Sequence, residues 1–271
     1  MKDRFASLVE LVRSLGPAAV AFSGGVDSGL VALAAFHAHG KKAVAYTIAS
    51  ELSTKNEEKD ARWLAKSIGI KHEVIRLKLL GVDDIARNCP DRCYHCKKLV
   101  FGTILEHAAK KGVHVLLDGT NADDLMSYRP GARAVAELGV RSPLAELGLG
   151  KDDIRSMAKH QDLPNHDKLS VPCLSTRFPY GERLTRERIL RVHEAEEFIR
   201  SLGIEALRVR DHNGLARIEA GIKDIPMVAS GRLAEKIVAK LTSLGYNYVT
   251  VDLEGFRSGS MDRVIGARDT N

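Results

Sequence analysis

The sequence has few aromatic residues and no long hydrophobic run. Phe, Trp and Tyr make up 5% of its 271 residues, so a base-stacking platform for single-stranded nucleic acid is poorly supported. No apolar run approaches the roughly 20 residues that a membrane-spanning helix needs. The segment 1–16 carries acidic residues within its apolar periodicity, unlike a signal peptide. We therefore expect a soluble cytoplasmic protein with no membrane partner.

Cysteine is scarce as well. The chain has four cysteines, Cys89, Cys93, Cys96 and Cys173. The cytoplasm keeps thiols reduced, so a structural disulfide framework is not expected there. Metal binding or catalysis is therefore the main functional interpretation of these thiols.

The charge balance is mildly basic. Lys and Arg number 41 against 35 Asp and Glu, for a net charge of +6, and the basic residues are scattered along the chain. Such a distribution is typical of a solvated surface and suits an anionic small substrate such as a nucleotide equally well. A nucleic acid is not the partner that this pattern favours.

Short apolar runs alternate with longer helical patterns in the first part of the chain. The runs lie at residues 18–22, 43–48, 72–77 and 113–118. Thr54 and Glu57 have the spacing of a capping box at the start of one intervening helix. Strands that alternate with helices predict an α/β fold with a doubly wound parallel sheet, whose ligands bind beyond the carboxyl ends of the strands.

The order of elements changes from about residue 185. A charged helix is followed there by a strand pair, a second helix and a further strand. This order predicts a separate, smaller α/β domain. We therefore divide the chain into domains 1–170 and 171–271, in keeping with a length that is large for one compact domain.

The segment SGGVDS, residues 23–28, follows the first predicted strand and opens the first helix after it. Its glycines let backbone N–H groups turn toward a ligand, and the helix start favours an anion. No lysine follows the glycines, so this is not the GxxxxGK[ST] phosphate loop, and it is not the GxGxxG fingerprint. From the glycines alone, a tight turn capped by Asp27 or Ser28 is an equally good explanation.

SGGVDS matches the SGGxDS loop (PP-loop) of the N-type ATP pyrophosphatases, which cleave ATP between its α and β phosphates and adenylate a substrate. The resemblance implies that the loop residues surround pyrophosphate, with Asp27 near a Mg²⁺ ion. These residues are Ser23, Gly24, Gly25, Asp27 and Ser28. It also implies that adenine lies near Thr47 and Ile48, at the end of the second predicted strand.

Five later motifs narrow the resemblance. They are DGTNADD (118–124), YRPGARA (128–134), PCLSTRFPYG (172–181), RVRDHNGLARIE (208–219) and LEGFRSGSMD (253–262). Together they resemble the LarE family of ATP-dependent sulfur transferases, which build the nickel-pincer cofactor of lactate racemase, and the likeness runs from about Val20 to Met261. It implies a homo-oligomer and a functional link to the enzymes of that cofactor. Gly119 and Arg129 would then bind ATP, and Arg133 is a further candidate for the phosphates, with surface salt bridges as the alternative for both arginines.

The resemblance also implies the chemistry. The substrate of the family is a pyridinium dicarboxylate mononucleotide, whose carboxylate is adenylated before a cysteine sulfur displaces AMP. In one branch the cysteine that corresponds to Cys173 gives up its own sulfur. From the residues alone, the positive charge of Arg177 would favour the thiolate form of Cys173. The alternative is that Cys173 is simply a small buried residue.

Arg208 and Arg210 alternate on a predicted strand, so both side chains leave by one face and can hold a phosphate. An exposed strand face is the plain alternative, and the resemblance favours the phosphate of the substrate. Glu219 and one of Glu196 and Glu197 are candidates for a divalent-metal site near that phosphate, with a solvated helix face as the alternative for the helix glutamates.

Cys93 and Cys96 are three residues apart, so on a helix they face the same way and can hold a metal. A zinc ribbon would need a second such pair, which the sequence lacks. A CxxC and a distant cysteine, here Cys173, resemble the three-cysteine branch that carries a [4Fe-4S] cluster with one open iron. Sacrifice of the Cys173 sulfur and two inert helix cysteines remain alternatives, and Cys89 is a spare or alternative ligand.

Two other functions stay open at this point. One is a tRNA thiolase of the same superfamily, which would bind tRNA in a salt-sensitive manner. The other is a non-catalytic iron–sulfur or nucleotide-sensing module, which would release no pyrophosphate. We favour the ATP-dependent sulfur transferase, with ATP, Mg²⁺ and a [4Fe-4S] cluster as its cofactors.

Overall fold

The computed structural model describes residues 2–125, 130–168 and 172–257. The chain divides into two compact units, the first formed by Met1–Leu79 and Asp91–Val171 and the second by Leu80–Pro90 and Pro172–Asn271. The second unit therefore includes an excursion, Leu80–Pro90, from the middle of the first. The division drawn from the sequence placed that segment in the N-terminal domain.

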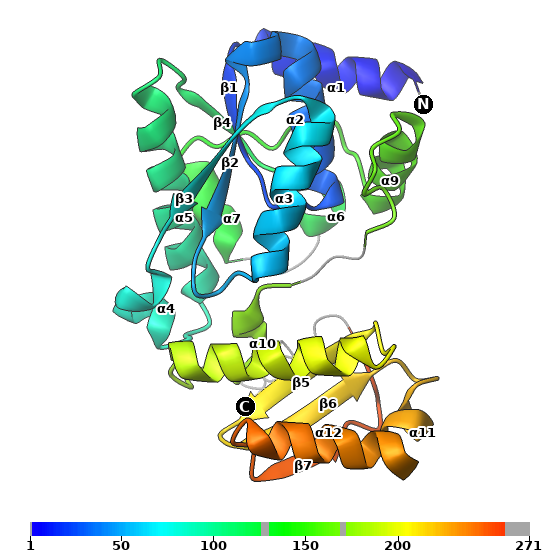
Figure 1. Ribbon diagram of the computed structural model, residues 1–271. Helices are drawn as coiled ribbons and strands as arrows, with labels where there is room; N and C mark the ends of the chain where they lie inside the picture. Colours follow the sequence, from blue (N-terminus) through cyan, green and yellow to red (C-terminus); the bar gives the residue numbers. More distant parts are fainter. Residues whose placement is uncertain (1, 126–129, 169–171, 258–271) are drawn as a thin grey trace, which may run out of the picture. The chain divides into compact units, whose positions relative to one another are not determined.

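A parallel sheet forms the centre of the first unit (Figure 1). Its strand order is β3-β2-β1-β4, and all three neighbouring pairs are parallel. The strands are β1 (Ala18–Ala21), β2 (Val44–Ala49), β3 (Lys71–Arg76) and β4 (Val115–Leu117). The prediction of an α/β fold with a parallel sheet is confirmed, and the four apolar runs are these four strands.

Helices cover both faces of this sheet (Figure 1). Those of the first unit are α1 (Lys2–Ser14), α2 (Val26–His39), α3 (Lys55–Ile68), α5 (Arg92–Ala109), α6 (Ala122–Leu125), α7 (Gly131–Glu137), α8 (Pro143–Glu146) and α9 (Lys151–His160), with a 3₁₀ turn at Gly40–Lys42. Successive β1 residues point to opposite faces. Ala18 and Val20 join the core under α1, α2, α3 and α9, while Ala19 joins the core under α5 and α7.

Helix α3 begins where the sequence predicts. The Thr54 side chain accepts a hydrogen bond from the Glu57 N–H, and the Glu57 carboxylate accepts one from the Thr54 N–H, so the predicted capping box is confirmed. The helix ends at Gly69 in the left-handed conformation, which glycine adopts without strain. These two local signals therefore determine where α3 begins and ends.

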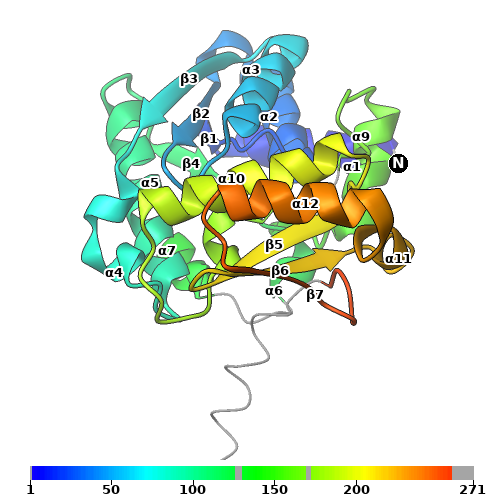
Figure 2. The ribbon, with the colours of Figure 1, turned by 60° about the horizontal axis from the view of Figure 1, so that its bottom comes forward.

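The second unit is a three-stranded sheet with helices packed on it (Figure 2). Its strands are β5 (Leu207–His212), β6 (Leu215–Ala220) and β7 (Tyr248–Val251), with β5 and β6 antiparallel and β6 and β7 parallel. Its helices are α4 (Asp83–Ala86), α10 (Arg186–Ser201), α11 (Ile225–Val228) and α12 (Gly231–Ser243). There are also 3₁₀ turns at Leu79–Gly81 and Leu174–Arg177, and the first of them spans the boundary between the units in the sequence. The α-β-β-α-β order predicted for this part is observed, with the short α11 inserted before α12. Within the described part of the chain, no helix combines the length and apolar character needed to cross a membrane.

Candidate functional site

The SGGVDS loop lies directly after β1 and leads into α2, at the carboxyl end of a central strand. Its hydroxyl groups bond to one another: Ser23 Oγ lies 3.0 Å from Ser28 Oγ, and the Ser23 N–H donates to Ser28 Oγ over 3.2 Å. Ser28 Oγ in turn donates to the Gly25 carbonyl. These hydrogen bonds join the loop to Ser28 in the first turn of α2, whose N-cap residue is Gly25.

Gly24 has a positive φ of +74° and lies against α3. A Cβ atom at this position would come within 2.9 Å of the backbone of Ala61. No other residue type fits here, because both the backbone conformation and the neighbouring helix exclude a side chain. The packing of α3 therefore depends on the glycine that the sequence motif requires.

We expect Gly24→Ala to cost more stability than Gly112→Ala and to weaken ATP binding at least about tenfold. Gly112 is a matched control, because it has the same φ of +74° but nothing within 4 Å of an added Cβ. The control should lose about 1 kcal/mol from the left-handed conformation alone. Urea unfolding and calorimetric titration with ATP measure the two effects, and equal ATP affinity in both variants would contradict the prediction.

Asp27 stands in the first turn of α2. Burial raises the pKa of its carboxyl above the ordinary value of 3.8, the nearby Asp124 adds to this rise, and a hydrogen bond from Asn121 opposes it. The Asn121 side-chain amide donates to Asp27 Oδ2 over 2.9 Å. A half-buried carboxylate with a neutral donor and a second acid close by is suited to a divalent cation.

Gly119 reaches the loop from the end of β4. A Cβ atom on it would lie 2.8 Å from the backbone nitrogen of Ser28. The DGTNADD motif therefore supplies two contacts to the start of α2, one from Gly119 and one from Asn121. The structure thus brings Gly119 to the loop with which the sequence grouped it, whereas the interaction of Asn121 with Asp27 was not anticipated.

The other ATP candidates have different surroundings. The Thr47 hydroxyl is buried, donates to the Phe22 carbonyl over 2.6 Å and lies 2.8 Å from His72 Nε2. Arg133 stacks on the ring of Tyr94 at 3.5 Å and pairs with Glu137, so its contacts are those of the salt-bridge alternative. Arg129 lies outside the described residues. Thr47 and Arg129 stay predictions as ATP ligands.

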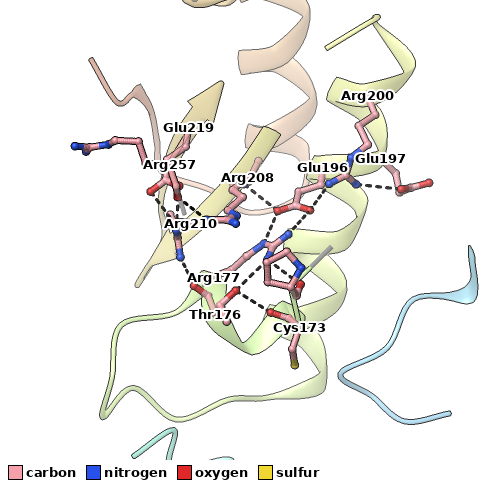
Figure 3. Close-up of polar contacts among 12 residues, drawn as sticks. Cys173, Thr176, Arg177, Glu196, Glu197, Arg200, Arg208, Arg210, Glu219 and Arg257 are labelled. Atoms are coloured by element: carbon pink, nitrogen blue, oxygen red, sulfur yellow. Dashed lines mark hydrogen bonds and ion pairs between the residues drawn. The ribbon is translucent and has the colours of Figure 1, made fainter. Parts of the chain in front are cut away.

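Two buried ion pairs dominate the second unit (Figure 3). Arg177 donates to Glu196 over 2.7 and 3.1 Å, and Arg210 donates to Glu219 over 2.9 Å twice. All four side chains are about 1% exposed. Such two-pronged pairs fix the planes of both guanidinium groups.

Arg208 adds a third buried cation to this cluster. Burial lowers its pKa to about 10, and Arg210 and Arg177 contribute to the decrease. Its Nη1 donates to the Arg257 carbonyl over 2.8 Å, and its Nε has no hydrogen-bond partner among the residues that the structure describes. Among the described residues, three buried arginines thus lie beside two buried carboxylates, and the buried Arg208 Nε–H has no acceptor there; such a cluster is suited to an anion.

Arg208 and Arg210 are buried, so the interpretation of an exposed strand face is wrong. Glu196 is equally inaccessible and accepts from Arg177 and Arg200, while Glu219 accepts from Arg210 and Arg217. The solvated-face alternative therefore fails for Glu196, but Glu197 is on the outer side and pairs with Arg200. As metal ligands, Glu196 and Glu219 stay predictions, and guanidinium groups are their contacts here.

The loop that carries Cys173 is fastened to the same cluster. Arg210 donates to the Thr176 carbonyl, and Arg177 donates to the Pro172 carbonyl over 3.0 Å. Cys173 itself is exposed, with its Sγ 3.0 Å from Ser175 Oγ. Figure 3 shows the Arg177 guanidinium turned toward α10 and the thiol turned away from it. The buried-residue alternative for Cys173 is therefore wrong, and the role of Arg177 here is to hold the loop.

Cys93 and Cys96 lie in the first turns of α5, within the first unit, and are half-buried. The Arg92 side chain donates to Cys93 Sγ over 3.4 Å. Cys173 and Cys89 belong to the second unit. In the described ranges, no group of three or more His, Cys, Asp or Glu side chains is placed to hold a metal ion. A cluster on Cys93, Cys96 and Cys173 stays a prediction.

An SGGxDS loop at the end of a central parallel strand, with its half-buried Asp27 in the first turn of the following helix, defines an ATP-using enzyme of the PP-loop superfamily. In agreement, residues 2–205 match the asparagine synthase family. The chain is 40% identical over 264 residues to the pyridinium-3,5-bisthiocarboxylic acid mononucleotide synthase of Lactiplantibacillus plantarum. The matched region covers 96% of this chain and 94% of that protein. The chain therefore belongs to the LarE family of ATP-dependent sulfurtransferases.

Two further relatives also match most of the chain. An uncharacterised protein of Synechocystis is 40% identical over 265 residues, which is 98% of this chain and 99% of that protein. An uncharacterised protein of Methanocaldococcus jannaschii is 33% identical over 241 residues, or 88% and 90% of the two chains. Each match spans both units, so the relation concerns the whole protein and not the ATP-binding unit alone.

Proposed function

We propose that the protein converts a carboxylate of pyridinium-3,5-dicarboxylate mononucleotide into a thiocarboxylate for the nickel-pincer cofactor of lactate racemase. The observation that carries this proposal is the cluster of buried arginines, Arg177, Arg208 and Arg210, in the same unit as the exposed Cys173. A phosphate-bearing substrate with a reactive group near that loop fits both features. The relationship to the synthase of Lactiplantibacillus plantarum supports the choice of substrate.

Adenylation is the first step. A carboxylate oxygen of the substrate attacks the α-phosphorus of ATP, the bond between the α and β phosphates breaks, and pyrophosphate leaves. The backbone N–H groups of Gly24 and Gly25 and the start of α2 would stabilise the charge on the leaving group. A bound Mg²⁺ would neutralise phosphate charge, and the half-buried Asp27 carboxylate is the oxygen ligand that suits it.

Arg208 and Arg210 would hold the phosphate of the substrate. A dianion beside Arg208 would offset the repulsion from Arg210 and Arg177 that lowers its pKa. It would also give the Arg208 Nε–H an acceptor. Substrate binding therefore supplies the charge that the cluster lacks.

Sulfur transfer is the second step, and Cys173 is its nucleophile or its anchor. In the sacrificial form, the thiolate attacks the acyl carbon and AMP leaves. Loss of the Cα proton then breaks the Cβ–S bond, which leaves a thiocarboxylate on the substrate and dehydroalanine in the chain. In the form that we favour, Cys93, Cys96 and Cys173 would hold a [4Fe-4S] cluster, which would be the source of the sulfur and leave the chain intact. Cys173 is exposed, whereas Cys93 and Cys96 are half-buried.

A comparison of two substrates tests the proposed function. Purified protein, ATP and Mg²⁺ are incubated with the pyridinium dicarboxylate mononucleotide, and pyrophosphate, AMP and thiocarboxylate are quantified. We expect all three to form with the mononucleotide and none with bulk tRNA at low salt. Salt-sensitive tRNA binding with thiolated tRNA as the product would establish the tRNA thiolase instead. No pyrophosphate release with either substrate would support a sensing module.

The assembly and pathway predictions remain part of this proposal. We infer a homo-oligomer and a product consumed by a nickel-inserting step of cofactor synthesis. Sedimentation of the purified protein tests the first. The second is tested by adding the thiocarboxylate product to an enzyme that loads nickel.

A further inference from the structure

The Gly24 carbonyl of the SGGVDS loop accepts two side-chain donors from distant residues. The Asn165 amide donates to it over 3.1 Å, and the Lys168 ammonium donates over 3.3 Å. These residues lie 141 and 144 positions further along the chain. Asn165 is 6% exposed, so its bond to the carbonyl is shielded from water.

Lys168 is held in place from the other side by α3. Its ammonium pairs with the Asp60 carboxylate at 2.8 Å, and the next residue, Ala61, is the one that Gly24 packs against. The loop is thus enclosed between α3 and the segment 163–168. A cavity of about 280 Å³, lined in part by Asp60 and Lys168, opens beside this contact.

The orientation of the Gly24–Gly25 peptide matters for phosphate binding. In a trans peptide the carbonyl of one residue and the N–H of the next point in opposite directions. The donors on the Gly24 carbonyl therefore constrain which way the Gly25 N–H points. In this structure that N–H donates to Ser23 Oγ over 3.3 Å, a contact that a phosphate oxygen would replace. Because a glycine stands on each side of this bond, no Cβ opposes a flip of the peptide plane.

We propose that Asn165 and Lys168 are positioning residues that hold the Gly24–Gly25 peptide in the orientation in which the Gly25 N–H binds a phosphate of ATP. The inference rests on the proposed role of the SGGVDS loop as the pyrophosphate site. It is independent of the carboxylate that is adenylated. Neither residue belongs to the motif, and neither is placed in contact with ATP by the proposal.

ATP and pyrophosphate binding test the proposal directly. Lys168→Met should weaken the affinity for both ligands about tenfold, since a charged donor is lost, and Lys168→Arg should restore most of it. Asn165→Asp places an acceptor against the carbonyl in the same volume and should weaken binding at least as much. Lys159→Met is the control, because Lys159 is exposed on α9 of the same unit. Titration calorimetry supplies the affinities, and thermal melting checks that each variant folds.

Kinetics separates positioning from general damage. For Lys168→Met we expect a higher KM for ATP with an unchanged KM for the carboxylate substrate. Wild-type affinity for ATP in both Lys168→Met and Asn165→Asp would overturn the proposal, as would an equal loss in Lys159→Met. If the wild-type protein binds ATP but does not consume the pyridinium mononucleotide, the proposed substrate fails, and the affinity comparison still decides the role of these two residues.

Discussion

Replacing Cys173 with alanine is expected to reduce thiocarboxylate formation at least about 10³-fold while pyrophosphate release from ATP persists. Adenylation requires the loop after β1 and a carboxylate, but no sulfur atom. Displacement of AMP requires the Cys173 thiol in both forms of the proposed transfer. Mass spectrometry of the product and a coupled pyrophosphate assay measure the two steps separately.

Two further cysteine variants complete the experiment: Cys89→Ala is the control, and Cys93→Ala distinguishes the two sources of sulfur. Cys89→Ala removes a thiol from the same unit and should leave both steps unchanged. Cys93→Ala should abolish product only if a cluster supplies the sulfur. Iron in the anaerobically purified protein and an unchanged intact mass after turnover would support the cluster, whereas loss of one sulfur from Cys173 without iron would rule it out. Full product formation by Cys173→Ala would contradict both forms.

Replacing Glu196 with glutamine is expected to lower the free energy of unfolding by about 3–5 kcal/mol, because it leaves the Arg177 charge buried without its counterion. Both side chains are 1% exposed, and Glu196 also accepts from the Val209 N–H over 3.1 Å. Glu187→Gln is the matched control on the same helix. Its pair with Arg191 is exposed, so it should cost less than about 1 kcal/mol. Urea unfolding followed by circular dichroism measures both, and equal losses would contradict the prediction.

The same carboxylate should make stability depend on acidity. Burial by itself would raise the pKa of Glu196, but the ion pairs with Arg177 and Arg200 outweigh it and lower the pKa below its ordinary value of 4.5. A carboxyl whose pKa falls on folding stabilises the protein fully above its unfolded pKa, and loses that effect as pH falls through the folded value. We therefore expect the difference in stability between wild type and Glu196→Gln to shrink below pH 4.5.

Local signals were enough to predict much of this architecture. The four parallel strands follow from apolar runs, and α3 follows from Thr54 and Glu57, whose interaction spans only three residues. The SGGVDS loop and Gly119 were found through the resemblance to known families, and the structure shows that a Cβ atom at Gly24 or Gly119 would meet neighbouring backbone. Each of these features is determined by short stretches of chain.

Long-range partners could not be found in this way. Arg177 and Glu196, and likewise Arg210 and Glu219, meet only after α10, β5 and β6 have packed, and a charged residue in a sequence does not show which charge it will face. Nothing in the local sequence around Lys168 indicates that its ammonium donates to the Gly24 carbonyl, 144 residues earlier in the chain. Arg177 was expected to act on the thiol of Cys173, whereas the hydrogen bonds that the structure assigns to it hold Glu196 and the loop backbone.

The excursion Leu80–Pro90 means that the second unit is not encoded by one continuous stretch of sequence. Asn88 donates to the carbonyls of Phe178 and Pro179, and the Gly181 N–H donates to the Asn88 carbonyl, so this early segment supports the stretch that follows the Cys173 loop. During synthesis on the ribosome, Leu80–Pro90 emerges long before those partners and must wait for them. A gene fragment that begins at residue 172 would encode Cys173 without the segment that supports the residues after it. A fragment intended to fold as the second unit would therefore also have to include Leu80–Pro90.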